Sequence, residues 1–140
     1  MTKFMYILLI LMLITSGCGK FSNMPLPKAT AHVENSNISI PVGVTSSSWG
    51  LTGESYGGPW DAMENKEPIQ VPGNSKITLT FDHPPKEVKA NENLSKDTFK
   101  KVNYESNQIA VPADKGIHIY SFIANWPKGT AVYALKVEVK

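Results

Sequence analysis

The sequence has no arginine, one cysteine and almost no net charge. Its 14 basic residues are all lysines and stand against 12 acidic residues, which leaves a formal net charge of +2. We expect no nucleic-acid partner, because proteins that bind nucleic acids concentrate positive charge on one surface. Arginine is also the usual side chain for two-point recognition of phosphate or carboxylate, so its absence disfavours such a site. An AT-rich genome would by itself explain this absence, and we favour that explanation.

The single cysteine, Cys18, cannot form a disulfide within the chain. The 17 residues before it include a lysine near the start, an almost wholly apolar run over residues 4–14 and small residues at the end. These are the parts of a secretory signal, and the run is shorter than the roughly 20 residues that a membrane-spanning helix needs. The sequence therefore predicts an exported protein. The alternative for Cys18 is an incidental cysteine close to a cleavage site.

The residues around Cys18 resemble the lipobox of bacterial lipoproteins, in which small residues precede an invariant cysteine. Ser16 and Gly17 fit that pattern, whereas Thr15 stands where leucine is commonest. The resemblance implies that residues 1–17 are a lipoprotein signal peptide and that Cys18 carries acyl chains. More than one acyl chain anchors a protein stably. We therefore expect the chain to be lipid-anchored on the extracytoplasmic face of the bacterial cell membrane, with the membrane as a partner.

Residues 18–37 are predicted to be a flexible tether. They contain Pro25 and Pro27 among Asn, Ser, Thr and Gly residues, and they show little periodicity. From Ile38 onward, short runs of alternating apolar residues are separated by turn residues. Residues 38–140 are therefore expected to be one folded domain.

The folded part is predicted to be an all-β, antiparallel, immunoglobulin-like sandwich of six or seven short strands. Its clearest unit is a hairpin in which residues 117–126 and 131–139 flank a four-residue turn. In the last strand, alternate residues from Ala131 to Val139 are apolar and face one way, and Lys136 and Glu138 face the other. No segment has a convincing helical pattern, and residues 92–101 are expected to be a loop. With no disulfide available, the core alone must hold the sheets together. Tyr120 stands early in the penultimate strand, where a tyrosine-corner residue would stand.

The strand at residues 117–126 is apolar on both faces. Tyr120, Phe122 and Ala124 lie on one face, and Ile119 and Ile123 lie on the other. A central strand whose second face is partly covered explains this pattern. The alternative is a surface through which the protein docks on a membrane complex as an accessory subunit.

The end of the chain resembles the closing hairpin of small uncharacterised lipoproteins of Gram-positive bacilli. The resemblance rests on Gly116, Tyr120, the run from Ala124 to Gly129 with its Trp126, and Tyr133. It covers roughly the last 25 residues together with the leader. It implies an immunoglobulin-like fold and a cell-surface location, and it implies no catalytic residues.

The sequence gives no strong indication of a catalytic or metal-binding site. His32, His83 and His118 share no short motif with another ligand, so each is expected to be solvated or packed, and no metal or other cofactor is predicted. Ser55 stands in a Gly-x-Ser-x-Gly pattern, from Gly53 to Gly57, but the catalytic form of this pattern lies at a turn from a strand into a helix, and no helix is expected here. Cys18 is expected to be consumed by lipid. We therefore predict that the protein is not an enzyme.

The best candidate for a binding surface is the loop at residues 49–67. Loops of this length within a compact domain are often functional, and this one holds three aromatic residues among glycines and acids. The candidate binding residues are Trp49, Tyr56, Trp60 and Asp61. The alternative is that Trp49 and Trp60 fold back to cap one end of the sandwich.

Three functional interpretations follow from these observations. We favour a lipid-anchored, non-catalytic, immunoglobulin-like module that binds a protein or another component of the cell envelope. The second is an accessory subunit that docks through residues 117–126. The third is a small surface enzyme or inhibitor that uses the loop at residues 49–67.

Overall fold

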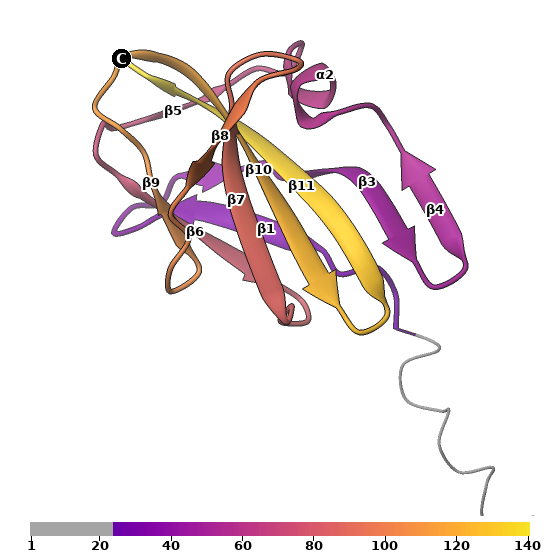
Figure 1. The fold of residues 1–140 in the computed structure, drawn as a ribbon. Coiled ribbons are helices and arrows are strands. Elements are labelled where there is room, and N and C mark those ends of the chain that lie inside the picture. Colours follow the sequence, from indigo (N-terminus) through magenta and orange to yellow (C-terminus); the bar gives the residue numbers. More distant parts are fainter. Residues whose placement is uncertain (1–23) are drawn as a thin grey trace, which may run out of the picture.

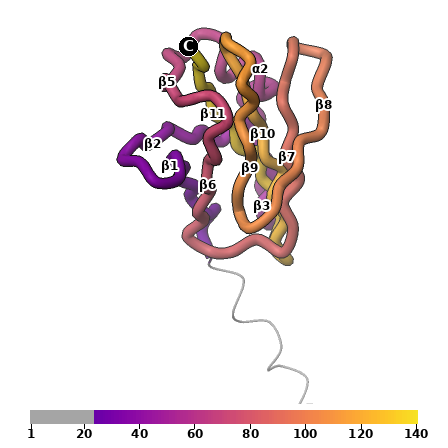
Figure 2. Tube along the Cα trace, turned by 90° about the vertical axis from the view of Figure 1, so that its left-hand side faces the viewer, coloured from indigo at the N-terminus to yellow at the C-terminus, as the bar shows by residue number. Residues whose placement is uncertain are grey.

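The computed structural model describes residues 24–140, which form eleven strands and one short helix. The predicted antiparallel β-sandwich is confirmed. One layer is a four-stranded sheet, and the other is a seven-stranded sheet. Figure 2 shows the layers from the side, with β1, β2 and β6 on one side and β7 and β8 on the other. The signal peptide, Cys18 and residues 18–23 of the predicted tether lie outside the described residues.

Hydrogen bonding sets the order of the strands in each sheet. The smaller sheet runs β2 (Ser39–Ile40), β1 (Ala29–Val33), β6 (Lys76–Phe81) and β9 (Gln108–Ala110). The larger sheet runs β4 (Thr52–Ser55), β3 (Gly43–Trp49), β11 (Gly129–Val139), β10 (Gly116–Trp126), β7 (Glu87–Asn93) and β8 (Phe99–Val102), as Figure 1 shows. In addition, β5 (Ile69–Val71) pairs with β11 in parallel.

The number of strands exceeds the prediction, partly because one predicted strand is divided between the two sheets. The alternating run that begins at Ile38 ends its first strand at Ile40, and β3 starts at Gly43 in the other sheet. Pro41 and Val42 carry the chain from one layer to the other. A proline is compatible with this crossing, because it has no backbone N–H to offer to a sheet.

The hairpin of β10 and β11 forms the centre of the larger sheet. The pairing continues to its tip, where Trp126 faces Gly129, so that the turn contains only Pro127 and Lys128. The predicted four-residue turn is therefore wrong. The predicted facing of β11 is correct, since its alternate residues from Ala131 to Val139 are buried between the layers.

The core lies between the two sheets and is richest in aromatic rings near the tip of this hairpin. Trp126 meets Trp49 at a ring-centroid distance of 5.4 Å and Phe81 at 5.7 Å, in both cases edge to face. Phe81 also meets Tyr133 at 5.4 Å. Such edge-to-face pairs contribute beyond the area they bury, so this end of the sandwich is firmly closed without a disulfide.

The folded domain already includes Met24, the first residue that the structure describes, well before the predicted boundary at residue 38. Met24 and Leu26 pack against the core, Pro27 is fully buried, and β1 occupies Ala29–Val33. The composition of this segment resembles a linker, but its alternate apolar residues complete the smaller sheet through pairing with β6. The prediction of a tether that extends to residue 37 is therefore wrong for residues 24–37.

Two predictions of irregular structure are also wrong. The loop at residues 49–67 contains β4 and a short helix, α2 (Pro59–Met63), which begins with proline at its first position. The predicted loop at residues 92–101 is the hairpin between β7 and β8. The first of these segments has no strong periodicity, because β4 is exposed throughout and α2 has barely more than one turn.

Candidate functional site

Trp49, the first of the predicted binding residues, belongs to the core. It ends β3, is 8% exposed and stacks edge to face on Trp126. Its indole Nε1 donates a 2.9 Å hydrogen bond to the carbonyl oxygen of Met24, and the Lys128 ammonium lies 5.7 Å above its ring. Trp49 therefore follows the alternative interpretation, in which it closes one end of the sandwich.

The other three predicted binding residues lie near α2, each with different surroundings. Tyr56 is 63% exposed, and its hydroxyl donates a 2.5 Å hydrogen bond to Glu54 Oε2, which raises the pKa of the phenol. Trp60 is half-buried against Met63 in a small apolar cluster beneath α2. Asp61 Oδ1 lies 3.5 Å from Lys96 Nζ. The structure thus separates Trp49 from the rest.

The apolar cluster beneath α2 covers the outer face of β10. It consists of Met63, Ile119 and Ala134, with Trp60 and Ala62 around them, and Ile119 is 2% exposed. Strand β10 is also paired on both edges, with β7 and β11. The apolar second face of residues 117–126 is therefore explained in large part by this cover.

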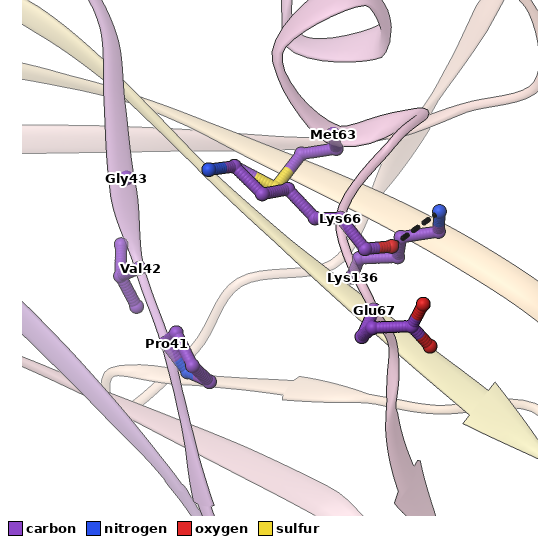
Figure 3. A pocket seen from close by; sticks show the side chains of 7 residues that line it. All are labelled: Pro41, Val42, Gly43, Met63, Lys66, Glu67 and Lys136. Carbon is purple, nitrogen blue, oxygen red and sulfur yellow. Dashed lines mark hydrogen bonds between the residues drawn. The ribbon is translucent and has the colours of Figure 1, made fainter.

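The end of the predicted loop forms one wall of a cleft, shown in Figure 3. Its volume is about 290 Å³. Met63 reaches over the cleft from the end of α2, and Lys66 does so from the segment after α2. Pro41 and Val42 line the opposite wall (Figure 3). The complete lining is Pro41, Val42, Gly43, Met63, Lys66, Glu67 and Lys136. An apolar floor with a few charged groups is typical of ligand-binding clefts.

Lys136 holds this wall in place. It projects from the outer face of β11, and its ammonium donates 2.8 Å hydrogen bonds to the carbonyl oxygens of Glu64 and Lys66. The segment after α2 has no sheet partner until β5, so these two bonds fix its backbone. Sequence analysis missed this role, although the position of Lys136 among inward-facing apolar residues marked it as outward-facing.

A second hollow of about 400 Å³ lies along β7 and β8. Its lining includes Phe99, which is 60% exposed, together with Lys101 and Tyr104. Burial raises the pKa of Tyr104. None of the predicted binding residues lines this hollow, and it lies on the opposite edge of the sheet from β4.

A buried polar network lies inside the sandwich, at the end of β10 remote from the hairpin tip. His118 Nδ1 is 2.7 Å from Glu92 Oε1, and its Nε2 is 2.9 Å from the carbonyl oxygen of Asp114. Lys100 Nζ lies 3.0 Å from Glu92 Oε2. Burial alone would raise the pKa of Glu92, but the hydrogen bonds from His118 and Lys100 outweigh it and lower the pKa.

Two tyrosines are buried in the core, and only one of their hydroxyl groups has a hydrogen-bond partner among the described residues. Tyr133 donates a hydrogen bond to the carbonyl oxygen of Pro27, and burial raises its pKa to about 12. The hydroxyl of Tyr120 is buried and has no hydrogen-bond partner among residues 24–140. Burial, with the charge of Glu92 nearby, raises its pKa strongly. Tyr120 therefore does not form the tyrosine corner that its position suggested; Tyr133 makes the comparable long-range bond.

The histidines lie apart from one another. His32 is exposed on β1, His83 is exposed in the turn between β6 and β7, and His118 is packed against Glu92. Within residues 24–140 no group of three or more His, Cys, Asp or Glu side chains is close enough to hold a metal ion. In the same part of the chain, no helix has the length and apolar character needed to cross a membrane.

Comparisons with known proteins found one distant structural similarity. No protein-family model and no curated protein matches the chain, so the resemblance to lipoproteins of Gram-positive bacilli stays a prediction. A solved structure of Bacillus amyloliquefaciens CBM33 in complex with Cu(I) after photoreduction is similar, with 16% identity and a TM-score of 0.40. The similarity covers 53% of this chain and 56% of that one, so it spans little more than half of the CBM33 chain.

This comparison contradicts the prediction that the protein is not an enzyme. The similar solved structure is a copper complex, and a fold by itself does not exclude catalysis. The prediction was based on the sequence alone, and a sequence does not reveal residues that meet only in the folded structure. It is therefore withdrawn.

Proposed function

We propose that this chain is a lipid-anchored protein of the extracytoplasmic face of the bacterial cell membrane, and that its β-sandwich binds a segment of another envelope protein. The anchor is supported by the apolar run in residues 4–14 and by the small residues before Cys18. The binding role is supported by the cleft between Pro41 and Lys136.

The observation that carries this proposal is the separation between the start of the domain and the cleft. Met24 is held at the tip of the β10–β11 hairpin by the ammonium of Lys128. Lys136 stands seven residues farther along β11 than Gly129, a distance of about 24 Å at roughly 3.4 Å per residue. A domain anchored through Cys18 would therefore hold its hairpin tip near the lipid and present the cleft away from it.

The chemistry of the cleft favours a peptide that carries an apolar side chain and, close to it, a carboxylate. Pro41, Val42 and Met63 offer apolar surface. The ammonium of Lys136 is already bound to two carbonyl oxygens. Among the described residues, the ammonium of Lys66 makes no hydrogen bond or ion pair, and it is therefore the group available to a carboxylate. A volume of about 290 Å³ accommodates one or two side chains of such a segment.

The anchor is tested by replacing Cys18 with serine in the full chain. We expect the wild-type protein to partition into the detergent phase of a detergent–water separation and Cys18→Ser to move to the aqueous phase. Equal partitioning of the two proteins would show that acyl chains on Cys18 do not hold the protein.

The cleft is tested by placing a photo-crosslinking amino acid at Val42 in cells that make the acylated protein. The matched control carries the same group at Thr80, which is exposed on the other sheet. We expect a discrete crosslinked product from position 42 that position 80 does not give and that Lys66→Glu abolishes. The same products from both positions, or a product that persists in Lys66→Glu, would exclude the cleft as the binding site.

A further inference from the structure

Three turns meet at one end of the sandwich, which we call the hairpin end. It consists of residues 50–51 between β3 and β4, residues 82–86 between β6 and β7, and residues 127–128 between β10 and β11. The Gly50 N–H donates to the Lys128 carbonyl oxygen at 3.2 Å, and the Lys86 N–H donates to that of Asn125 at 2.7 Å. In Figure 1 these turns lie together at the lower end of the molecule. The hydrogen bonds make them one continuous surface.

The chain enters the domain at this same end and is fixed there. The carbonyl oxygen of Met24 accepts hydrogen bonds from Trp49 Nε1 at 2.9 Å and from Lys128 Nζ at 2.8 Å. Met24 follows Cys18 by only six residues. Even a fully extended chain of that length spans no more than about 20 Å. A lipid on Cys18 would therefore keep the hairpin end close to the headgroups of the membrane.

Leu51 lies in the turn between β3 and β4 and is fully exposed on this surface. It is 106% exposed, the highest value among the exposed large hydrophobic residues of the described part of the chain. It contacts no core, and the adjacent β4 is exposed along its whole length, so packing does not explain an apolar side chain here. Apolar side chains that project beside lysines are typical of surfaces that enter the headgroup region of a bilayer.

The charged residues of the hairpin end are compatible with a lipid headgroup layer. Lys28, Lys86 and Lys128 lie at this end, against Asp82 and Glu87. The Asp82 carboxylate accepts a hydrogen bond from the backbone N–H of Lys28. The small positive excess favours anionic lipids without acting as an anchor by itself.

We propose that the hairpin end is a lipid-contacting surface, with Leu51 inserted among the headgroups of the membrane that holds Cys18. This inference rests on the proposed lipid anchor and adds an orientation to it. The short distance from Cys18 to Met24 supplies proximity, and the contact at Leu51 limits rotation of the domain. The cleft at Lys136 then faces outward.

The test uses the full chain, purified with its acyl chains, in which Leu51→Cys provides one free thiol for an environment-sensitive fluorophore. The matched control is Asp97→Cys, in the turn between β7 and β8. That turn lies at the opposite end, because β7 runs from Glu87 beside the hairpin end to Asn93 beside Ile119. Both proteins are placed in vesicles of phosphatidylglycerol and phosphatidylethanolamine, with and without brominated acyl chains.

We expect brominated lipid to quench the probe at position 51 several-fold more strongly than the probe at position 97. Equal quenching at the two positions would overturn the inference while leaving the anchor intact. A blue-shifted probe at position 51 that brominated lipid does not quench would also overturn it, because a second copy or another protein would then cover Leu51. Failure of the anchor is recognised separately, since a free Cys18 thiol gives two probes per chain and no flotation with vesicles.

Discussion

The hydroxyl of Tyr133 donates a 2.5 Å hydrogen bond to the carbonyl oxygen of Pro27, across 106 positions of sequence. Both residues are fully buried. The bond joins the middle of β11, the longest strand of the larger sheet together with β10, to the segment that leads into β1 of the smaller sheet. It therefore fastens residues 24–28 to the core, and the domain cannot release them without leaving the buried hydroxyl of Tyr133 unpaired.

Tyr133→Phe is expected to destabilise the domain. The substitution leaves the Pro27 carbonyl oxygen buried without a donor, which costs about 1–3 kcal/mol and lowers the melting temperature by several degrees. Thermal unfolding followed by circular dichroism measures the change. The control is Tyr104→Phe, whose hydroxyl has only an exposed contact at 3.5 Å with Asn107. A melting temperature no lower for Tyr133→Phe than for this control would contradict the expectation.

Tyr120→Phe is expected to have the opposite effect. The Tyr120 hydroxyl is buried without a partner in the described part of the chain, so it loses its hydrogen bonds to water and gains none in the fold. Its removal should leave stability unchanged or raise it by up to about 1 kcal/mol. Urea unfolding of the two Tyr→Phe variants under one set of conditions measures the contrast. Similar losses in both variants would mean that the Tyr120 hydroxyl has a partner.

Glu92 is expected to make stability depend on pH on the acid side. Its pKa is lowered in the fold, below the ordinary value of 4.5, mainly through His118 and Lys100. A lowered pKa stabilises the folded state above the ordinary pKa, and this contribution is lost as the pH falls through the pKa of the folded state. The difference in unfolding free energy between wild type and Glu92→Gln should therefore shrink from pH 7 to pH 3.

Urea unfolding at successive pH values measures this difference, and Glu105→Gln, an exposed site on a loop, is the control. The control should show a small difference at every pH. A difference between wild type and Glu92→Gln that stays constant from pH 7 to pH 3 would show that the Glu92 carboxylate gains nothing from its neighbours in the fold.

The sequence predicted best those features that depend on local periodicity. Alternation along residues 131–139 identified the buried face of β11, and the same reasoning placed Tyr120 and Phe122 on one face of β10. The apolar second face of β10 also led to the correct expectation that another segment partly covers it. The helix that provides this cover was missed, because five residues that begin with Pro59 carry no helical period.

The candidate site was harder to predict because it depends on distant contacts. Whether Trp49 binds or packs is decided by Trp126 and Met24, which lie far from it in sequence. The cleft joins residues 41–43 to the segment after α2 and to Lys136, and no local pattern links them. The burial of Glu92 could not be predicted either, because a carboxylate in a polar segment is normally exposed. In the structure Glu92 pairs with Tyr120 on the neighbouring strand.

Replacement by alanine should change the stability of the domain very differently at Trp49 and at Tyr56, two of the predicted binding residues. Trp49→Ala removes a buried ring that stacks on Trp126 and bonds to Met24, and a loss of about 3–5 kcal/mol is expected. Tyr56→Ala removes an exposed ring and should change stability by less than about 0.5 kcal/mol. Melting temperatures of the two variants measure the contrast. A large loss in Tyr56→Ala would show that Tyr56 packs against the domain.

Gly129 is required where the β10–β11 hairpin meets β3. A Cβ atom at this position would overlap the carbonyl oxygen of Ser48 and lie only 3.1 Å from Trp49 Cα. These are backbone atoms of the paired strand, so no side-chain rotation can relieve the contact, and the two strands must separate at the hairpin end. Gly129→Ala is therefore expected to lower stability by at least about 1–3 kcal/mol.

The matched control is Gly53→Ala on β4, where the nearest atom to the new Cβ, the carbonyl oxygen of Ser47, lies at an ordinary 3.7 Å. Both changes add one methyl group to a strand beside β3, so helix or strand propensity does not distinguish them. Thermal unfolding should separate the two variants by several degrees. If they melt together, β3 and β11 are not held as closely as Ser48 and Gly129 indicate.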